Sequence, residues 1–164
     1  HFVSLDVTWG RSCQPGTEQV KWLEEDLAAV AGKRDLVVVY FHLPAATCGS
    51  YANHAGTTTR ARRLLATLKK YGVNLVFCGH DHNYQRWDLG DGLTQVVTGG
   101  LSSKILYDID EEAEMRGRAE GGLLKALKVP HYVLVDVDGP RAKVSVLTEG
   151  RTRSDEFTVV AGTP

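Results

Sequence analysis

Two histidines one residue apart lie directly after an apolar run in the stretch VFCGHDHNYQRW, residues 76–87. Neutral imidazole is a good ligand for zinc, iron and manganese. A pair of loop histidines held by backbone hydrogen bonds would have the same sequence, and any short motif carries this risk of accidental matches. The spacing of His80 and His82 therefore indicates metal binding only weakly, and their position in the fold has to decide.

The segments before this pair predict a strand, a helix and a second strand. The run Leu36–Phe41 is apolar along its length, as in a strand of a parallel sheet that is covered on both faces. A helix is expected from about Thr58 to Lys70, with Gly72 as its terminator. The short segment NLVFC, residues 74–78, predicts a second buried strand. Two strands joined in this way usually lie parallel and close together.

Three histidines are therefore expected at one edge of the sheet. His42 follows the first strand, and His80 follows the second strand with only Gly79 between. We expect Gly79 to permit the sharp turn that brings the next imidazole toward an ion. Ligands of open α/β sheets bind outside the carboxyl ends of the strands, which favours metal binding by His42, His80 and His82. The alternative for His42 is a strand-end histidine bonded to a neighbouring carbonyl.

The carboxylates that a catalytic metal centre normally adds are scarce near these histidines. Asp81 lies between the two histidines of the motif and is expected to point away from a site that both of them face. Asp6 and Asp88 are candidates, but no motif supports them. On these residues alone the predicted metal site is incomplete.

The remaining sequence predicts an α/β chain whose C-terminal third is antiparallel. The charged segment 108–128 has helical tendency interrupted by glycines. Further elements are expected at Phe2–Val7 (strand), Thr17–Ala31 (helix), Leu93–Thr98 (strand), 131–137 and 141–148 (a hairpin turning at Asp138–Gly139), and Glu156–Val160 (strand).

The composition predicts a soluble globular protein. The 164 residues are 43% hydrophobic with a formal net charge of -1, which gives no basic patch for nucleic acid. No apolar run approaches the roughly 20 residues that a membrane span requires. Cys78 is expected in the core, while Cys13 and Cys48 lie in loops where a disulfide could form if the protein is secreted. The compartment stays open.

Several motifs occur in a characteristic order. They are WLEEDLAAV at residues 22–30, YFHLP at 40–44, GHDH at 79–82 with its extension HNYQR at 82–86, VVTGG at 96–100, and HYVLVDVDG at 131–139. This set resembles the second half of the calcineurin-like metallophosphoesterases, nearest to the purple acid phosphatase branch. The resemblance implies half of a four-layer αββα sandwich, a βαβ unit followed by antiparallel strands, with a dinuclear metal site at the strand ends.

The resemblance also implies roles for single residues. His42 and His80 would bind one metal ion and His82 the other, the two ions being iron, zinc or manganese. His54 is similar to the family histidine that contacts substrate phosphate and protonates the leaving group, and a solvated loop histidine is the alternative. Arg86 would be a further contact to the phosphate ester, although packing is favoured for its neighbours Tyr84 and Trp87. Metal-activated water would be the nucleophile.

The first half of the family, with its Asp-x-His, bridging-aspartate Gly-Asp and Gly-Asn-His motifs, has no counterpart here. The resemblance therefore implies that residues 1–164 are a single domain, the C-terminal portion of a metallophosphoesterase domain whose N-terminal half is absent. The isolated chain is expected to be inactive, and the alternative function is a non-catalytic interaction module. We expect the sheet face that the absent half would cover to be apolar and exposed. This face would recruit the missing half, a second chain, or another copy by dimerisation or strand exchange.

Overall fold

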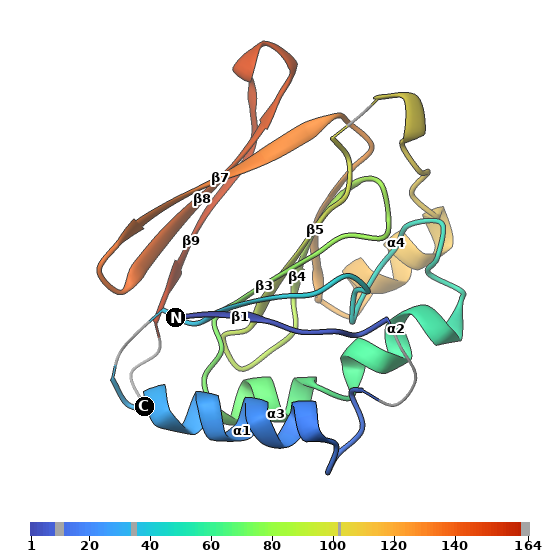
Figure 1. Ribbon diagram of the computed structural model, residues 1–164. Coiled ribbons are helices and arrows are strands. Elements are labelled where there is room, and N and C mark those ends of the chain that lie inside the picture. The colour runs from blue at the N-terminus through green and yellow to red at the C-terminus, as the bar shows by residue number, and fades with distance from the viewer. Residues whose placement is uncertain (9–11, 34–35, 102, 162–164) are drawn as a thin grey trace.

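The structure is a computed structural model that describes residues 1–8, 12–33, 36–101 and 103–161. The strands of this part form a six-stranded sheet of order β1-β2-β3-β5-β4-β6 and a three-stranded sheet of order β7-β8-β9 (Figure 1). None of the described helices is long and apolar enough to span a membrane. The strands are β1 (Phe2–Ser4), β2 (Val38–Tyr40), β3 (Leu75–Cys78), β4 (Tyr84–Asp88), β5 (Thr94–Thr98), β6 (Leu123–Leu127), β7 (His131–Asp138), β8 (Arg141–Thr148) and β9 (Arg153–Val160).

The predicted strand–helix–strand unit is confirmed in its main feature. Strands β2 and β3 are adjacent and parallel, with Val38 opposite Leu75. The single helix expected over residues 58–70 is wrong, because the structure has α2 (Ala55–Arg62) and α3 (Leu65–Lys70) in its place. The break follows from two amides, those of Arg63 and Leu64, which bond to carbonyls three residues back and tighten the turn between the helices.

Two strands were not expected from the sequence. Strand β4 runs antiparallel between β5 and β6, directly after the histidine motif. Strand β6 follows α4 (Glu111–Ala119) inside the charged segment, so helical tendency was correct only for the first part of that segment. The other predictions hold, since α1 (Glu18–Val30), the hairpin of β7 and β8, and strand β9 all form.

The two sheets pack face to face, and helices cover the other face of the larger sheet (Figure 1). Successive residues of β3 point to opposite faces of the larger sheet. Val76 belongs to the core beneath α1 and α3, whereas Leu75 packs with Val144 and Val146 of β8. Helix α4 lies over Trp87, where a Cβ on Gly117 would come within 2.6 Å of the indole ring. The layers are therefore helix, sheet and sheet, a mixed α/β fold as expected.

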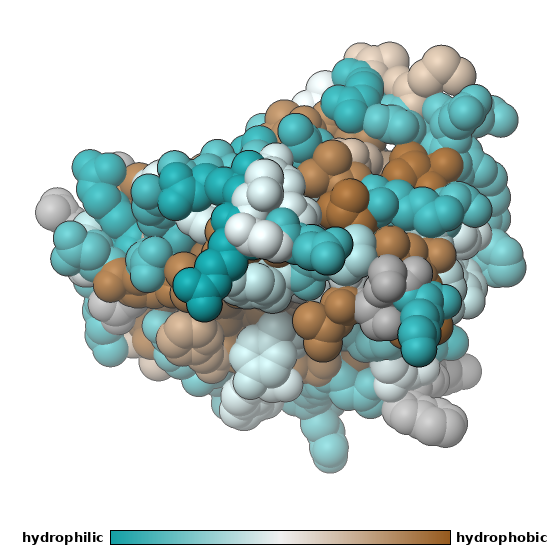
Figure 2. All heavy atoms as spheres, turned by 90° about the horizontal axis from the view of Figure 1, so that it is seen from above, coloured by the Kyte–Doolittle hydropathy of each residue, from teal (hydrophilic) through white to brown (hydrophobic). Residues whose placement is uncertain are grey.

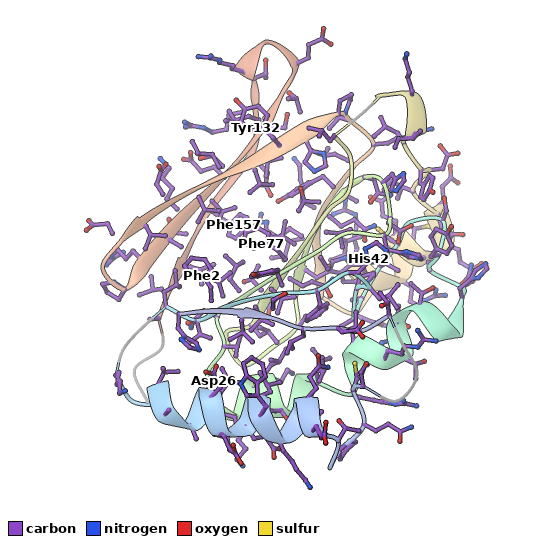
Figure 3. All side chains as sticks on the ribbon, viewed as in Figure 1. Phe2, Asp26, His42, Phe77, Tyr132 and Phe157 are labelled. Atoms are coloured by element: carbon purple, nitrogen blue, oxygen red, sulfur yellow. The ribbon has the colours of Figure 1, made fainter. Side chains whose placement is uncertain are left out.

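Aromatic side chains between the two sheets differ in how far they are buried. Phe2, Phe77 and Phe157 lie in the space between the sheets in Figure 3. Phe77 and Phe157 are partly buried in the inter-sheet core, but Phe2 is 70% exposed and Tyr40 is 47% exposed. On the face seen from above, Figure 2 shows hydrophobic groups in separate patches among hydrophilic ones. Phe2 and Tyr40 thus remain exposed on β1 and β2, although Val38 of β2 packs against the smaller sheet.

Candidate metal centre

Two histidine rings meet where β2 and β3 end. His80 Nδ1 lies 3.2 Å from His42 Nε2, and the two rings stand at 81° with centroids 5.1 Å apart. The Gly79 amide donates to the His42 carbonyl oxygen at 3.0 Å, which ties the two strand ends together. Two imidazole nitrogens on one tetrahedral zinc ion, each about 2.05 Å from the metal, are about 3.3 Å apart. The pair therefore has the separation that a shared ion requires.

His80, rather than Gly79, has the unusual backbone. His80 has φ 68°, in the left-handed region, which costs a residue with a Cβ about 1–2 kcal/mol. A Cβ built on Gly79 would meet no described atom within 4 Å. The expectation that Gly79 makes the sharp turn is therefore wrong. The strained conformation of His80 itself turns its imidazole toward His42, and strain of this kind is often found at functional sites.

The ring of His82 is held on one edge and on one face. His82 Nδ1 lies 2.9 Å from the Ile105 carbonyl oxygen. The ring stacks on Tyr107, with centroids 4.1 Å apart and planes at 14°. Because a carbonyl oxygen only accepts, Nδ1 carries the proton of the neutral ring, and the lone pair stays on Nε2. This is the arrangement in which a histidine is prepared to bind a metal ion.

Tyr51 connects the remaining histidines to the pair. Its ring centroid lies 4.2 Å from that of His80, 5.4 Å from that of His54 and 5.8 Å from that of Tyr107. Burial lowers the pKa of His80, and the nearby His42 lowers it further. The neutral form, which binds metals, is thereby favoured. Sequence reasoning missed Tyr51 and Tyr107, because neither has a spacing that marks it and their contacts cross between loops.

Asp81 points away from the histidines, as predicted. Its buried carboxylate accepts hydrogen bonds from the Thr47 hydroxyl and, at 3.3 Å, from the Tyr51 amide. A Cβ on Gly49 would lie 2.4 Å from the same carboxyl group, so the loop passes directly over it. Burial raises the pKa of Asp81, and the hydrogen bond from Thr47 opposes that rise. Asp81 therefore anchors the loop that carries Tyr51 and His54.

The other acidic candidates are also engaged locally. The Asp88 carboxylate accepts from the Gly90 amide at 2.8 Å, and the Asp6 carboxylate accepts from the Thr8 amide at 2.7 Å. Within the described part of the chain, no group of three or more His, Cys, Asp or Glu side chains is arranged to hold a metal ion. The described residues thus offer part of a ligand set.

Two buried glutamines fix the loop after β2. Gln95 Oε1 accepts from the Ala45 amide at 2.8 Å, and Gln85 Oε1 accepts from the Cys48 amide at 2.9 Å. Both side chains project from the larger sheet, on strands β5 and β4. Buried amides with satisfied hydrogen bonds hold a backbone in one position. The loop between His42 and His54 is therefore positioned by the sheet beneath it.

Arg86 contacts the smaller sheet rather than the histidines. Its Nε lies 2.9 Å from Asp155 Oδ2 in an ion pair, and its guanidinium lies 4.6 Å from the centroid of the Phe157 ring. The Tyr84 hydroxyl donates to the same carboxylate at 2.7 Å. Tyr84 and Trp87 are buried packing residues, as favoured from the sequence. Arg86 and Tyr84 join the two sheets through Asp155.

The three cysteine thiols are buried and free. Cys13 belongs to the core beneath the helices, whereas Cys48 belongs to a separate cluster beside α4. A disulfide between them, left open by the sequence, is therefore not formed. Cys78 lies in the core as expected. Burial raises the pKa of Cys48 to about 12, which keeps it a thiol.

Comparisons with known proteins agree with the fold. The family model of the calcineurin-like phosphoesterases matches residues 4–84. Tartrate-resistant acid phosphatase type 5 of Rattus norvegicus is 36% identical over 98 residues, which are 60% of this chain and 28% of that protein. The Homo sapiens protein of the same name is 34% identical over 98 residues, 60% of this chain and 29% of that protein.

Two solved structures share the fold. Purple acid phosphatase PPD1 from yellow lupin (Lupinus luteus) has a TM-score of 0.77 at 18% identity, covering 97% of this chain and 31% of its own. GAP50, described as the anchor in the inner membrane complex of Plasmodium, has a TM-score of 0.68 at 15% identity, covering 98% of this chain and 49% of its own.

These findings confirm the resemblance: residues 4–84 match the calcineurin-like phosphoesterase family, and the fold is that of a purple acid phosphatase. Within that group it is similar to the purple acid phosphatase branch. It spans less than a third of the length of the acid phosphatases that it matches, 28% in the case of the rat protein.

Proposed function

We propose that this chain supplies part of the metal centre of a phosphoesterase that hydrolyses phosphate esters with metal-activated water. The observation that carries the proposal is the 3.2 Å separation of His42 Nε2 and His80 Nδ1 at the carboxyl ends of two parallel strands. His42 and His80 would hold one ion, and Nε2 of His82 would hold the second. The ions are iron, zinc or manganese, and when bound they lower the pKa of water so that a nucleophile is available near neutral pH.

His54 is proposed to contact the substrate phosphate and to protonate the leaving group. Its side chain is exposed, and its ring lies beside Tyr51, which in turn contacts His80. An exposed imidazole at this position can approach a phosphate that is bound near the metal ions. Arg86 is the second proposed phosphate contact, as a cationic side chain that could line the substrate pocket. Its ion pair with Asp155 favours the packing alternative for that residue.

We further propose that the chain is the C-terminal portion of one catalytic domain, and that a second polypeptide segment completes it. The missing N-terminal half is the favoured partner, and a second copy joined by dimerisation or strand exchange is the alternative. The described residues offer no carboxylate-containing ligand group, and carboxylates are what a dinuclear centre normally adds. The partner would therefore have to bring acidic side chains to the histidines.

The opening between the two sheets offers a surface for that segment. One cavity of about 410 Å³ is lined by Tyr40, His42, Phe77 and Thr98. A second of about 390 Å³ shares Phe77 and Thr98 with it and extends to Tyr132. In Figure 3 Tyr132 lies above Phe77 and His42 to its right. A segment that fills this opening would cover exposed apolar side chains and would reach His42.

A non-catalytic role is the second candidate function. GAP50, which shares the fold at a TM-score of 0.68, is described as an anchor and not by an enzymatic activity. The incomplete ligand group of this chain is compatible with a similar use of the fold, as a module that binds a partner.

Hydrolysis assays separate the two candidates. p-Nitrophenyl phosphate and bis-p-nitrophenyl phosphate are supplied with zinc, manganese or iron. They are tested on the chain alone and on the chain co-expressed with an N-terminal half that carries the missing motifs. We expect background rates for the chain alone and metal-dependent turnover for the combination. His82→Ala should lower that turnover by at least tenfold. His1→Ala should not, because His1 lies beside Asp26 at the opposite, N-terminal end of the parallel strands.

Two results would contradict this function. A combination that sediments as one complex but stays inert with every metal would favour the non-catalytic module. Turnover that is unaffected by His82→Ala would remove that residue from the metal centre. The partner proposal has its own test, since a chain that sediments as a well-behaved monomer and fails to bind the N-terminal half would refute it.

A further inference from the structure

We propose that Tyr107 is a positioning residue that fixes the ring orientation and tautomer of His82. The functional role of this positioning rests on the proposed function, in which His82 binds a metal ion through Nε2. The geometry on which it depends belongs to the chain itself and needs no metal.

The segment that ends at Tyr107 holds His82 at three points. The Tyr107 amide donates to the His82 carbonyl oxygen at 3.0 Å, which fixes the backbone. His82 Nδ1 donates to the Ile105 carbonyl oxygen at 2.9 Å, which fixes one ring edge. The Tyr107 ring covers one ring face at 4.1 Å and 14°. Backbone, ring edge and ring face are therefore all held by residues 105–107.

Ring stacking is the contact that opposes a flip of the imidazole. A rotation of 180° about the Cβ–Cγ bond exchanges Nδ1 with Cδ2 and Nε2 with Cε1. The flipped ring would lose its bond to Ile105 and would present a carbon where Nε2 had been. Such a rotation sweeps the ring through the space that Tyr107 occupies. Tyr107 thus protects the orientation in which the lone pair is available.

Tyr107 is itself held by a row of aromatic rings. The centroid of its ring lies 5.8 Å from that of Tyr51, and the Tyr51 centroid lies 4.2 Å from that of His80. The Tyr51 amide is bonded to the buried carboxylate of Asp81. The row His80, Tyr51, Tyr107 and His82 therefore links two of the three proposed metal-binding histidines. Their relative geometry is set before any ion binds, and such preorganisation favours function.

The test is the tautomer of His82 in the metal-free chain, read by long-range ¹H–¹⁵N correlation spectroscopy above the histidine pKa range. We expect one Nδ1–H tautomer in the wild type and in Tyr107→Phe, which keeps the ring. Tyr107→Ala should give a mixture of tautomers. Trp22→Ala, which removes an exposed aromatic ring on α1, should leave the signal unchanged. An unchanged tautomer in Tyr107→Ala, or equal loss in Tyr107→Phe, would overturn the proposal.

A role in packing alone makes a different prediction. It would lower the free energy of unfolding of Tyr107→Ala, as measured by urea denaturation, without changing the tautomer of the folded fraction. Zinc titration adds the functional readout: Tyr107→Ala should bind zinc about 10–100-fold more weakly, the usual effect of losing a group that orients a metal ligand. A wild-type chain that keeps the single tautomer but binds no zinc would contradict the proposed function and leave the positioning role intact.

Discussion

His42 Nε2 and His80 Nδ1 lie 3.2 Å apart, although 38 residues separate them in the sequence. A neutral imidazole has one N–H and one lone pair. The two nitrogens can therefore share one proton in the metal-free chain. Both lone pairs become available together only when that proton is on neither His42 Nε2 nor His80 Nδ1. The parallel pairing of β2 and β3 produces this contact, since both strands deliver their next residues to the same edge.

We expect the backbone of residues 80–82 to require a glycine at position 99, because it passes close to Gly99. A Cβ at Gly99 would lie 2.4 Å from the Asp81 carbonyl oxygen and 3.3 Å from His82 Cα. Gly99→Ala should therefore displace the backbone of the motif and lower the free energy of unfolding by about 1–3 kcal/mol. Urea denaturation measures this loss.

Gly79→Ala is the matched control, because its Cβ would meet no described atom within 4 Å. We expect a change of no more than about 0.5 kcal/mol, as for an ordinary surface substitution. Equal losses for the two variants would show that close approach at Gly99 does not govern the loop.

The left-handed backbone of His80 predicts an inverted order of stability. Ala normally exceeds Gly in stability within ordered structure, but at φ 68° the alanine Cβ is strained and glycine is not. Both substitutions remove the same imidazole contacts. His80→Gly should therefore be more stable than His80→Ala by about 1 kcal/mol in thermal and urea unfolding. An alanine variant as stable as the glycine variant would refute the assigned conformation.

Acid should destabilise the fold through His131. This histidine is buried, its Nδ1 donates to the Val129 carbonyl oxygen at 3.0 Å, and its Nε2 lies 3.1 Å from the Thr98 hydroxyl. Burial lowers its pKa below the ordinary value of 6.5. Below pH 6.5 the unfolded chain therefore binds a proton at His131 that the folded chain does not. The free energy of unfolding thus decreases as the pH is lowered, by at most about 1.4 kcal/mol per pH unit.

Thermal unfolding across pH measures this slope. His131→Gln should show a smaller loss of Tm between neutral pH and pH 5.5 or so than the wild type, because the difference between the two isolates one titrating group. A variant whose Tm falls as steeply as that of the wild type would mean that other groups carry the acid sensitivity.

The sequence predicted the βαβ unit because its strands are uninterrupted apolar runs, Leu36–Phe41 and Leu75–Cys78. The meeting of His42 and His80 followed from that unit alone. Strand β4 was not predicted because Arg86 and Asp88 interrupt its apolar pattern. Its conformation is decided by pairing with β5 and β6.

The surroundings of the histidines were less accessible to sequence reasoning. Tyr107 lies 25 positions after His82, and the connection between them depends on how two loops cross. Asp81 was placed correctly, although the segment is not extended: its carboxylate turns to the Thr47 hydroxyl and the Tyr51 amide instead. The strain at His80 and the close approach at Gly99 depend on backbone angles that no spacing reveals.

Zinc titration of the metal-free chain by calorimetry tests the central claim most directly. We predict a saturable but weak site, because two or three imidazoles are fewer than the four ligands of a typical zinc site. His42→Ala and His80→Ala should each weaken binding at least tenfold, whereas His1→Ala, which removes the partner of Asp26, should bind as the wild type does. Equal zinc affinities in all four proteins, or no saturable binding to the wild type, would contradict the assignment of His42 and His80 as metal ligands.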